Sequence, residues 1–343
     1  MLHAAVKAIE YYLPERVVSS MELAAAFPEW PVEKIEGKTG ISERHIAAED
    51  ECSSDMAIAA SRRLFDSGVC AAKDIDYLLL CTQSPDYFLP TTACLVQDAL
   101  GIPTSAGALD FNLGCSGFVY GAGLAQGLIE TGQARNVLLI TAETYSKFMH
   151  ARDKSVRTIF GDAAAATLIS CIDSAEPLLG PFVVGTDGGG GKNLIVPAGG
   201  MRYPRSAETG TATEDQDGNW RSRDNLHMNG AEIFNFTLRV VPQCVERLLE
   251  KAGRSLGQID LFVFHQANLF MLEHLRRKLR IPQERFCVAM NPCGNTVSST
   301  IPIALKIAAE RGELRPGHLV MVVGFGVGYS WGAGLIRWQE TGA

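Results

Sequence analysis

The chain has 343 residues, 47% of them hydrophobic, which is enough for about two domains and a large buried core. Its formal net charge of -7 gives no overall attraction to nucleic acid or to an anionic membrane surface. The composition therefore predicts a globular protein with neither a nucleic-acid partner nor a membrane partner.

The nine cysteines are scattered and form neither a CxxC pair nor a Cys/His spacing typical of zinc sites. We therefore expect a reducing compartment and no metal site. Residues 1–13 lack a basic segment followed by an apolar one, so we expect a cytoplasmic protein. The apolar run 319–336 contains five glycines, which favour a strand, a tight turn and a second strand over a membrane-spanning helix.

Strands and helices alternate along the first half of the chain, which predicts an α/β fold. We expect buried strands at residues 5–12, 76–81, 106–112 and 137–142. We expect helices from Ser54 to Ser67, from the loop 83–90 to Leu100, and from Cys115 to Glu130. Ser53 or Ser54 is the expected N-cap of the first of these helices.

The same order of elements recurs roughly 180 residues later. Residues 260–264 match 76–81, residues 319–323 match 138–142, and Gly294-Asn295 match Gly114-Cys115. The repeat predicts two similar halves, residues 1–175 and 176–343, that pack about a pseudo-twofold axis. Cys115 and Asn295 would then occupy equivalent places at the starts of equivalent helices.

Residues 188–225 interrupt the repeat with four consecutive glycines and a polar stretch. This composition predicts a surface loop or lid inserted into the second half. An insertion without any role is an equally good interpretation of the same pattern.

Cys115 is the candidate nucleophile because it stands where an apolar strand meets a glycine-rich helix. We expect the free N–H groups and the positive end of the helix dipole to lower the pKa of its thiol. A buried structural cysteine is the alternative, and it suits the other eight cysteines better. Five glycines between 114 and 127 predict close packing against this helix, with the equivalent helix of the second half as the expected neighbour.

His265 and Asn295 are the candidate partners of Cys115. His265 directly follows the predicted strand 261–264, at the edge of a sheet where α/β proteins commonly place their sites. Each could be an ordinary residue, since a lone histidine is more often structural and an asparagine often caps a helix. Together, the three side chains fit covalent acyl transfer, in which sulfur attacks a thioester and the other two donate hydrogen bonds to an enolate oxygen.

Six motifs in this order resemble beta-ketoacyl-acyl-carrier-protein synthase III of the thiolase superfamily. They are GISERHIA at 40–47, GCSGF at 114–118, IFGDA at 159–163, HQAN at 265–268, GNT at 294–296 and GFGVG at 324–328. The motifs extend over nearly the whole chain, so the resemblance is far more specific than any one of them.

The resemblance implies a homodimer with the five-layered αβαβα thiolase fold and no cofactor besides its substrates, acyl-CoA and malonyl-acyl carrier protein. Cys115 would take the acyl group, and His265 and Asn295 would promote decarboxylation and condensation. The Cys115 amide and an amide of the Gly326-Val327 loop would form the oxyanion hole. Phe160 and Leu89 would line the acyl pocket, with Leu89 reaching across the dimer.

The family pattern also marks a binding region for coenzyme A or its pantetheine arm. Lys34 stands where acetyl-CoA-primed members have a tryptophan, and Lys38 and Lys154 stand where they have arginines. Asn268 closes the HQAN motif, and Phe270 replaces an arginine that contacts the carrier protein in the family. These departures affect the identity of the acyl donor and leave the cysteine chemistry intact.

Two other functions compete with a decarboxylating ketosynthase. An acyltransferase of the same family would move the acyl group from Cys115 to an alcohol or amine, with His265 as general base. A non-catalytic partner subunit of another synthase would retain only the dimer surface, against which the complete Cys115, His265 and Asn295 set argues.

Overall fold

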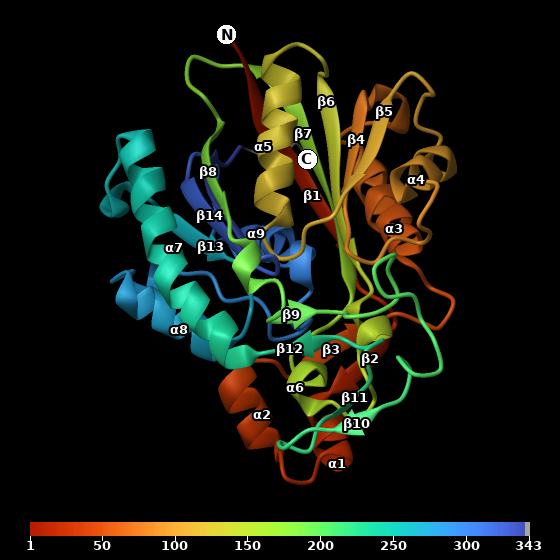
Figure 1. Ribbon diagram of the computed structural model, residues 1–343. Coiled ribbons are helices and arrows are strands. Elements are labelled where there is room, and N and C mark those ends of the chain that lie inside the picture. The colour runs from red at the N-terminus through yellow and green to blue at the C-terminus, as the bar shows by residue number, and fades with distance from the viewer. Residues whose placement is uncertain (340–343) are drawn as a thin grey trace.

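Two β-sheets stand side by side, with helices between them and outside them (Figure 1). The computed structural model describes residues 1–339. The first sheet has the order β1-β7-β6-β4-β5, with strands β1 (Leu2–Tyr12), β4 (Tyr77–Cys81), β5 (Gly107–Phe111), β6 (Asn136–Glu143) and β7 (Ala163–Asp173). The second has the order β13-β14-β15-β8, with strands β8 (Leu179–Thr186), β13 (Leu261–Phe264), β14 (Leu319–Gly326) and β15 (Ser330–Arg337).

The second sheet repeats the strand order and directions of the first. In the first sheet β4 pairs in parallel with β5 and β6, and β7 and β1 follow as antiparallel neighbours. In the second sheet β13 pairs in parallel with β14, and β15 and β8 follow as antiparallel neighbours. A single parallel bridge from Phe262 to Phe286 lies where the first sheet has β5. The apolar run 319–336 therefore forms two strands, and no helix within residues 1–339 is long and apolar enough to cross a membrane.

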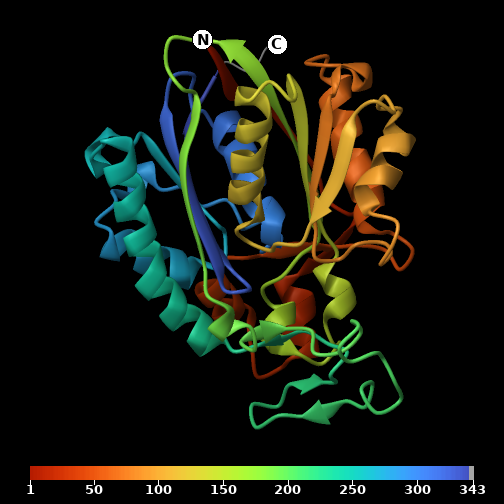
Figure 2. The same cartoon turned by 45° about the horizontal axis from the view of Figure 1, so that its top comes forward.

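The helices complete five layers, which confirms the predicted αβαβα fold (Figure 1, Figure 2). The middle layer holds α5 (Gly117–Glu130) and α9 (Thr300–Glu310). The outer layers hold α3 (Ser53–Asp66) and α4 (Thr92–Leu100) on one side, and α7 (Gly230–Ala252) and α8 (Leu269–Lys278) on the other. Fully buried aliphatic residues of β4, β6, β13 and β14 fill the space between the layers, which explains their near-continuous hydrophobic runs.

Shorter elements cover one end of the layered body (Figure 1). They are β2 (Arg16–Ser19), α1 (Ser20–Ala26), α2 (Val32–Thr39), β3 (Glu43–Ile46), α6 (Lys154–Arg157), β9 (Leu194–Ile195), β10 (Thr213–Glu214), β11 (Trp220–Arg221) and β12 (His227–Met228). Single 3-10 turns occur at η1 (Ala72–Asp74), η2 (Tyr145–Phe148), η3 (Gly188–Gly190), η4 (Leu256–Gln258), η5 (Gln283–Arg285) and η6 (Val297–Ser299). The β10–β11 hairpin, within the predicted insertion, extends furthest from the sheets (Figure 2).

Two details of the helices differ from the sequence prediction. Helix α3 has Cys52 as its N-cap, and the Cys52 N–H donates to Asp55 Oδ2 at 2.8 Å. The expected cap Ser54 instead donates its hydroxyl to Asp86 Oδ2 at 2.5 Å, which ties α3 to the loop after β4. Helix α5 begins at Gly117, so Cys115 lies in the turn just before the helix.

The glycines of α5 do not pack against α9, so that prediction was wrong. A side chain at Gly117 would collide with the sulfur of Cys81 at the end of β4. A Cβ at Gly121 would stand 2.5 Å from Leu139 of β6. Because these two positions have no side chain, the backbone of α5 can pack directly against the side chains of the first sheet.

Candidate active site

Cys115 is held between the turn after β5 and the end of β14. Its residue exposure is 4%. A Cβ at Gly326 would stand 3.0 Å from both Cβ and Sγ of Cys115, and one at Gly324 would stand 2.8 Å from the Cys115 carbonyl oxygen. Strand β14 can therefore approach the cysteine only because both positions are glycine.

Burial raises the pKa of the Cys115 thiol to about 12, and the nearby Glu143 carboxylate adds to the increase. Hydrogen bonds from the backbone N–H groups of Cys115 and Val327 to the sulfur act in the opposite direction. The sequence predicted a lowered pKa from the helix terminus, and burial outweighs that effect. The free thiol is therefore protonated at neutral pH and needs a base before it can attack.

His265 follows β13 and is 2% exposed. Burial lowers its pKa to about 3, so the imidazole is neutral over the physiological range. Its ring meets Phe325 edge to face, with centroids 5.4 Å apart. Phe325 and Gly326 are adjacent on β14, so this strand end contacts both His265 and Cys115.

Thr300, the first residue of α9, is the hydrogen-bond partner of His265. Its Oγ1 lies 2.7 Å from His265 Nδ1 and 3.0 Å from the Val297 carbonyl oxygen. The Thr300 hydroxyl can donate to that carbonyl, which also accepts the Thr300 backbone N–H, or it can turn its proton toward the ring. The hydroxyl can accept from a protonated Nδ1 or donate to an unprotonated one, so it supports either tautomer of the neutral imidazole.

Both the backbone and the side chain of Asn295 are held by hydrogen bonds, and the residue is 4% exposed. Its backbone forms a parallel bridge with Phe160, closed by hydrogen bonds from Asn295 N to Ile159 O at 2.9 Å and from Gly161 N to Asn295 O at 3.0 Å. Its Oδ1 accepts the Val297 N–H at 3.0 Å, and Nδ2 lies 3.4 Å from the Ala267 carbonyl oxygen. Ala267 belongs to the HQAN motif, so the structure brings Asn295 to the segment that carries His265.

Cys115 lies in an apolar cluster that borders a chamber of about 350 Å³. The cluster includes Phe160, whose ring centroid is 5.3 Å from that of Tyr145. Six members of the cluster or its immediate neighbours also line the chamber: Tyr145, Phe148, Leu194, Val196, Leu226 and Val327. Of these, the sequence singled out only Val327, because the other five belong to the insertion or lie in no recognised motif.

A groove of about 520 Å³ lies on another side of the same cluster. Ile159 and Met228 belong both to the groove lining and to the apolar residues around Cys115. The groove is also lined by the predicted residues Lys38, Lys154 and Asn268, together with Trp30 and Phe270. Asn268 also caps α8, since its Oδ1 accepts the Met271 N–H at 2.9 Å.

Trp30 was not recognised from the sequence. The Nζ atoms of Lys34 and Lys38 lie 4.7 and 5.3 Å from the centroid of its ring. Lys34 therefore does not line the groove itself but covers the indole that does. A tryptophan beside Pro31 in a polar stretch was the available signal.

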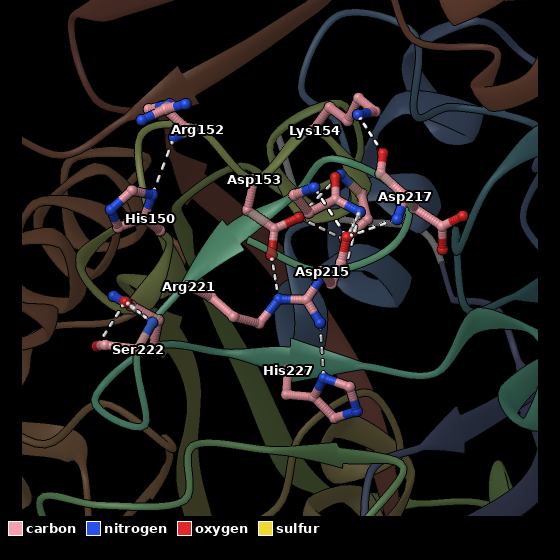
Figure 3. Close-up of polar contacts among 12 residues, drawn as sticks. His150, Arg152, Asp153, Lys154, Asp215, Asp217, Arg221, Ser222 and His227 are labelled. Carbon is pink, nitrogen blue, oxygen red and sulfur yellow. Dashed lines mark hydrogen bonds and ion pairs between the residues drawn. The ribbon is translucent and has the colours of Figure 1, made fainter. Parts of the chain in front are cut away.

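The insertion supplies one wall of this groove through Asp217 and Asn219. Lys154 Nζ donates to the Asp217 carbonyl oxygen at 2.7 Å (Figure 3). It also forms an ion pair with Glu29 at 3.1 Å. The Lys154 ammonium group therefore already has two partners within the chain, Asp217 and Glu29, before any ligand binds.

Arg221 anchors the insertion to the turn before α6 (Figure 3). Its Nε donates to Asp153 Oδ2 at 3.0 Å, a second nitrogen pairs with Asp215, and Nη1 lies 2.8 Å from His227 Nδ1. Burial and the Arg221 charge lower the pKa of His227, so this ring accepts the bond as a neutral group. Residues 188–225 are consequently packed against the site through a network of ionic hydrogen bonds.

Glu143, at the end of β6, is a fully buried carboxyl group that the sequence did not single out. It accepts the Gln83 N–H at 3.0 Å and the Ser298 hydroxyl at 2.9 Å, which joins the first sheet to the turn after Asn295. Burial raises its pKa to about 8. A mostly protonated Glu143 at neutral pH limits the repulsion of a Cys115 thiolate.

Leu89 does not line the chamber of its own chain. It is 82% exposed and follows Tyr87 and Phe88, which are 61% and 75% exposed.

The described residues 1–339 contain no group of three or more His, Cys, Asp or Glu side chains that could hold a metal ion.

The comparisons with known proteins agree along almost the whole chain. Models of 3-oxoacyl-[acyl-carrier-protein (ACP)] synthase III and of its C-terminal region match residues 109–188 and 249–338. The beta-ketoacyl-[acyl-carrier-protein] synthase III of Caldanaerobacter subterraneus subsp. tengcongensis is 36% identical over 335 residues, covering 96% of each chain. A solved 3-oxoacyl-(acyl-carrier-protein) synthase III is 53% identical, with a TM-score of 0.97 and coverage of 98% of this chain and 100% of that chain. A solved 3-oxoacyl-(acyl-carrier protein) synthase from Burkholderia xenovorans LB400 is 35% identical, with a TM-score of 0.89 and coverage of 99% and 95%. The chain therefore belongs to the 3-oxoacyl-[acyl-carrier-protein] synthase III family of the thiolase superfamily.

Proposed function

We propose that this chain is a decarboxylating ketosynthase that joins an acyl group to malonyl-acyl carrier protein. The observation that carries the proposal is the position of Cys115, whose apolar cluster borders both a largely apolar chamber and a groove lined in part by polar residues. The chamber suits an acyl chain, and the groove suits the pantetheine arm that brings it to the sulfur.

In the first step neutral His265 takes the proton of Cys115 as the sulfur attacks the thioester carbonyl of the donor. The N–H groups of Cys115 and Val327 both reach the sulfur in the free protein, and they stabilise the oxyanion of the tetrahedral intermediate. The donor thiolate leaves and takes the proton from His265, which leaves an acyl-cysteine and a neutral imidazole.

Between the two steps the neutral imidazole exchanges its proton with solvent and changes tautomer, losing it from Nδ1 and gaining one on Nε2. In the second step malonyl-acyl carrier protein loses carbon dioxide to give an enolate. Nε2–H of His265 and Nδ2 of Asn295 donate hydrogen bonds to the enolate oxygen, while the Thr300 hydroxyl donates to Nδ1. The enolate carbon attacks the acyl carbonyl, and the Cys115 thiolate leaves. The thiolate takes the Nε2 proton of His265, which is replaced from solvent, so the reaction consumes one proton overall.

We assign donor binding to Trp30, Lys34, Lys38, Lys154 and Asn268, because they line or cover one groove. Phe160 and Val327 bound the acyl side, with Gly326 at the cysteine. We also propose a homodimer in which the exposed Leu89 enters the partner's chamber, since an 82% exposed leucine between Phe88 and a proline is otherwise unexplained. We expect the enzyme to act in the cytoplasm and to need no cofactor. Its two similar halves would meet near residue 175.

The test is to incubate the purified protein with malonyl-acyl carrier protein and a panel of acyl-CoAs and to measure carbon dioxide and β-ketoacyl product together. We expect His265→Ala to reduce decarboxylation more than acylation of Cys115. Equal loss of both steps would show that His265 acts mainly on the sulfur, and no product with any donor would contradict the proposal.

An acyltransferase acting on an alcohol or amine is the second candidate. The observation in its favour is the neutral, deeply buried His265, which could serve as general base for such an acceptor. It would form an ester or amide without releasing carbon dioxide, so the same assay separates the two functions. Activity of the pure homodimer would exclude a non-catalytic partner subunit.

A further inference from the structure

A second cavity, of about 210 Å³, lies between β2, β3 and residues 146–157. Its lining includes three arginines, Arg16, Arg44 and Arg157. We call it the arginine pocket. It shares no lining residue with the chamber or the groove described above, so the proposed reaction makes no use of it.

Arg44 forms the buried end of the arginine pocket, and its exposure is 0%. Its guanidinium donates only to neutral oxygens, those of Val18, Ser20, Ile41 and Thr158, and no carboxylate of residues 1–339 forms an ion pair with it. Its Nε atom is buried and has no hydrogen-bond partner among these residues. Burial lowers the pKa of Arg44 only to about 10, so the group stays charged at neutral pH. The Glu36 charge acts on Arg44 and partly offsets the effect of burial, but Glu36 forms no ion pair with it. A buried charge without an ion-pair partner is costly, and a bound anion would lower that cost.

The other two arginines add to the positive charge. Arg157 is half-buried, and burial and the neighbouring Arg16 charge lower its pKa. Arg16 pairs with Glu22 at 2.9 Å, with both side chains largely exposed. Asp162 lies behind Ser146, where it already accepts the Ser146 and Ala47 N–H groups. Glu22 also acts on Arg157, and Glu36 acts on Arg44, so two carboxylates offset the charge of three guanidinium groups.

We propose that the arginine pocket binds a small tetrahedral oxyanion of the phosphate class. Guanidinium groups recognise phosphate oxygens through charge-assisted, often bidentate hydrogen bonds. The volume of about 210 Å³ is enough to admit such an anion. The anion would contact Arg16 and Arg157 and supply the counter-charge for Arg44 beneath them.

The arginine pocket adjoins the backbone that carries Asn295. Arg44 donates to the Thr158 carbonyl oxygen at 2.9 Å. Its Cβ would stand 3.1 and 3.2 Å from a Cβ placed on Gly294 and Gly161. An anion that ties β2, β3 and Arg157 together would therefore also stabilise the segment that precedes Asn295.

The experiment measures the Tm and the dissociation constant for inorganic phosphate, with potassium chloride of matched ionic strength as reference. It uses the full-length Lys38→Gln/Lys154→Gln protein, which removes the lysines of the groove as a competing phosphate site. We expect phosphate and sulfate to raise Tm by about 2 °C or more and chloride to raise it less. Glycerol phosphate is the second probe: weaker binding than that of inorganic phosphate would identify the free anion as the ligand, and equal or tighter binding would identify an organic phosphate.

Three further substitutions in that background assign the effect to the arginine pocket. Arg157→Gln and Arg16→Gln should each weaken phosphate binding about tenfold or more, whereas Glu22→Gln should tighten it by removing the competing carboxylate. Arg62→Gln, at an exposed arginine of α3, is the matched control and should leave it unchanged. Arg44 is left intact because its loss could prevent folding.

An anomalous-scattering crystal experiment with tungstate provides an independent measurement, and we expect a peak between Arg16 and Arg157. Phosphate stabilisation no greater than that of chloride would overturn the proposal. Equal affinity in Arg157→Gln and Arg62→Gln, or a peak only outside the arginine pocket, would overturn it as well.

Discussion

At the scale of single residues, burial makes Cys115 and His265 a neutral pair. It raises the pKa of the thiol to about 12 and lowers that of the imidazole to about 3. The proton therefore stays on sulfur in the free protein, and it moves only when a thioester receives the developing charge. This arrangement avoids a stored thiolate that would react with oxidants.

Thr300 controls the proton on His265 and carries the first prediction at this scale. We expect Thr300→Val to slow decarboxylation about tenfold or more while Cys115 acylation falls less, because the variant no longer donates to Nδ1. Thr300→Ser keeps the hydroxyl and should restore the rate. Separate rates of acylation and carbon dioxide release provide the measurement.

A purely structural role for Thr300 predicts a different pattern. Valine and serine would then reduce both rates in parallel with any loss of stability. Equal losses in the two variants would contradict the positioning role.

At the scale of elements, β14 shapes the site through its glycines. We expect Gly326→Ala to cost about 1–3 kcal/mol of unfolding free energy and to slow Cys115 acylation, because its Cβ would crowd the sulfur at 3.0 Å. A Cβ placed on Gly127 of α5 would have no neighbouring atom within 4 Å. Gly127→Ala should therefore raise the unfolding free energy by about 0.5–1 kcal/mol. Urea denaturation of both variants measures the difference, and an unchanged Gly326→Ala protein would refute the steric argument.

The sequence predicted those elements whose hydrophobic runs are long and bounded by turn residues. The strands at 76–81 and 137–142 and the helix ending at Leu100 agree with β4, β6 and α4. Helices α1 and α2 were missed because they are only seven and eight residues long, and they hold their shape by packing on each other and on Val18 of β2. The strands of the insertion are two residues long, too short to leave any periodic pattern.

At the scale of the whole molecule, the repeat was the most informative sequence signal. It predicted two sheets of equal topology, and strand order alone then places the ends of β4, β6, β13 and β14 at one level. The direction of the Cys115 pKa shift could not be predicted, because burial is a property of the packed chain. The arginine pocket was missed for the same reason, since Arg16, Arg44 and Arg157 are distant in sequence. Trp30 was overlooked although Lys34 and Lys38, which lie over its ring, follow within eight residues.

The central claim is that Cys115 carries the acyl group, and intact-protein mass spectrometry after incubation with acyl-CoA or acyl-carrier protein tests it most directly. We predict a single acyl adduct on the wild-type chain, mapped by digestion to the peptide containing Cys115, and none on a folded Cys115→Ala variant. An adduct that persists in Cys115→Ala, or its absence from the wild-type chain with every donor, would contradict the account.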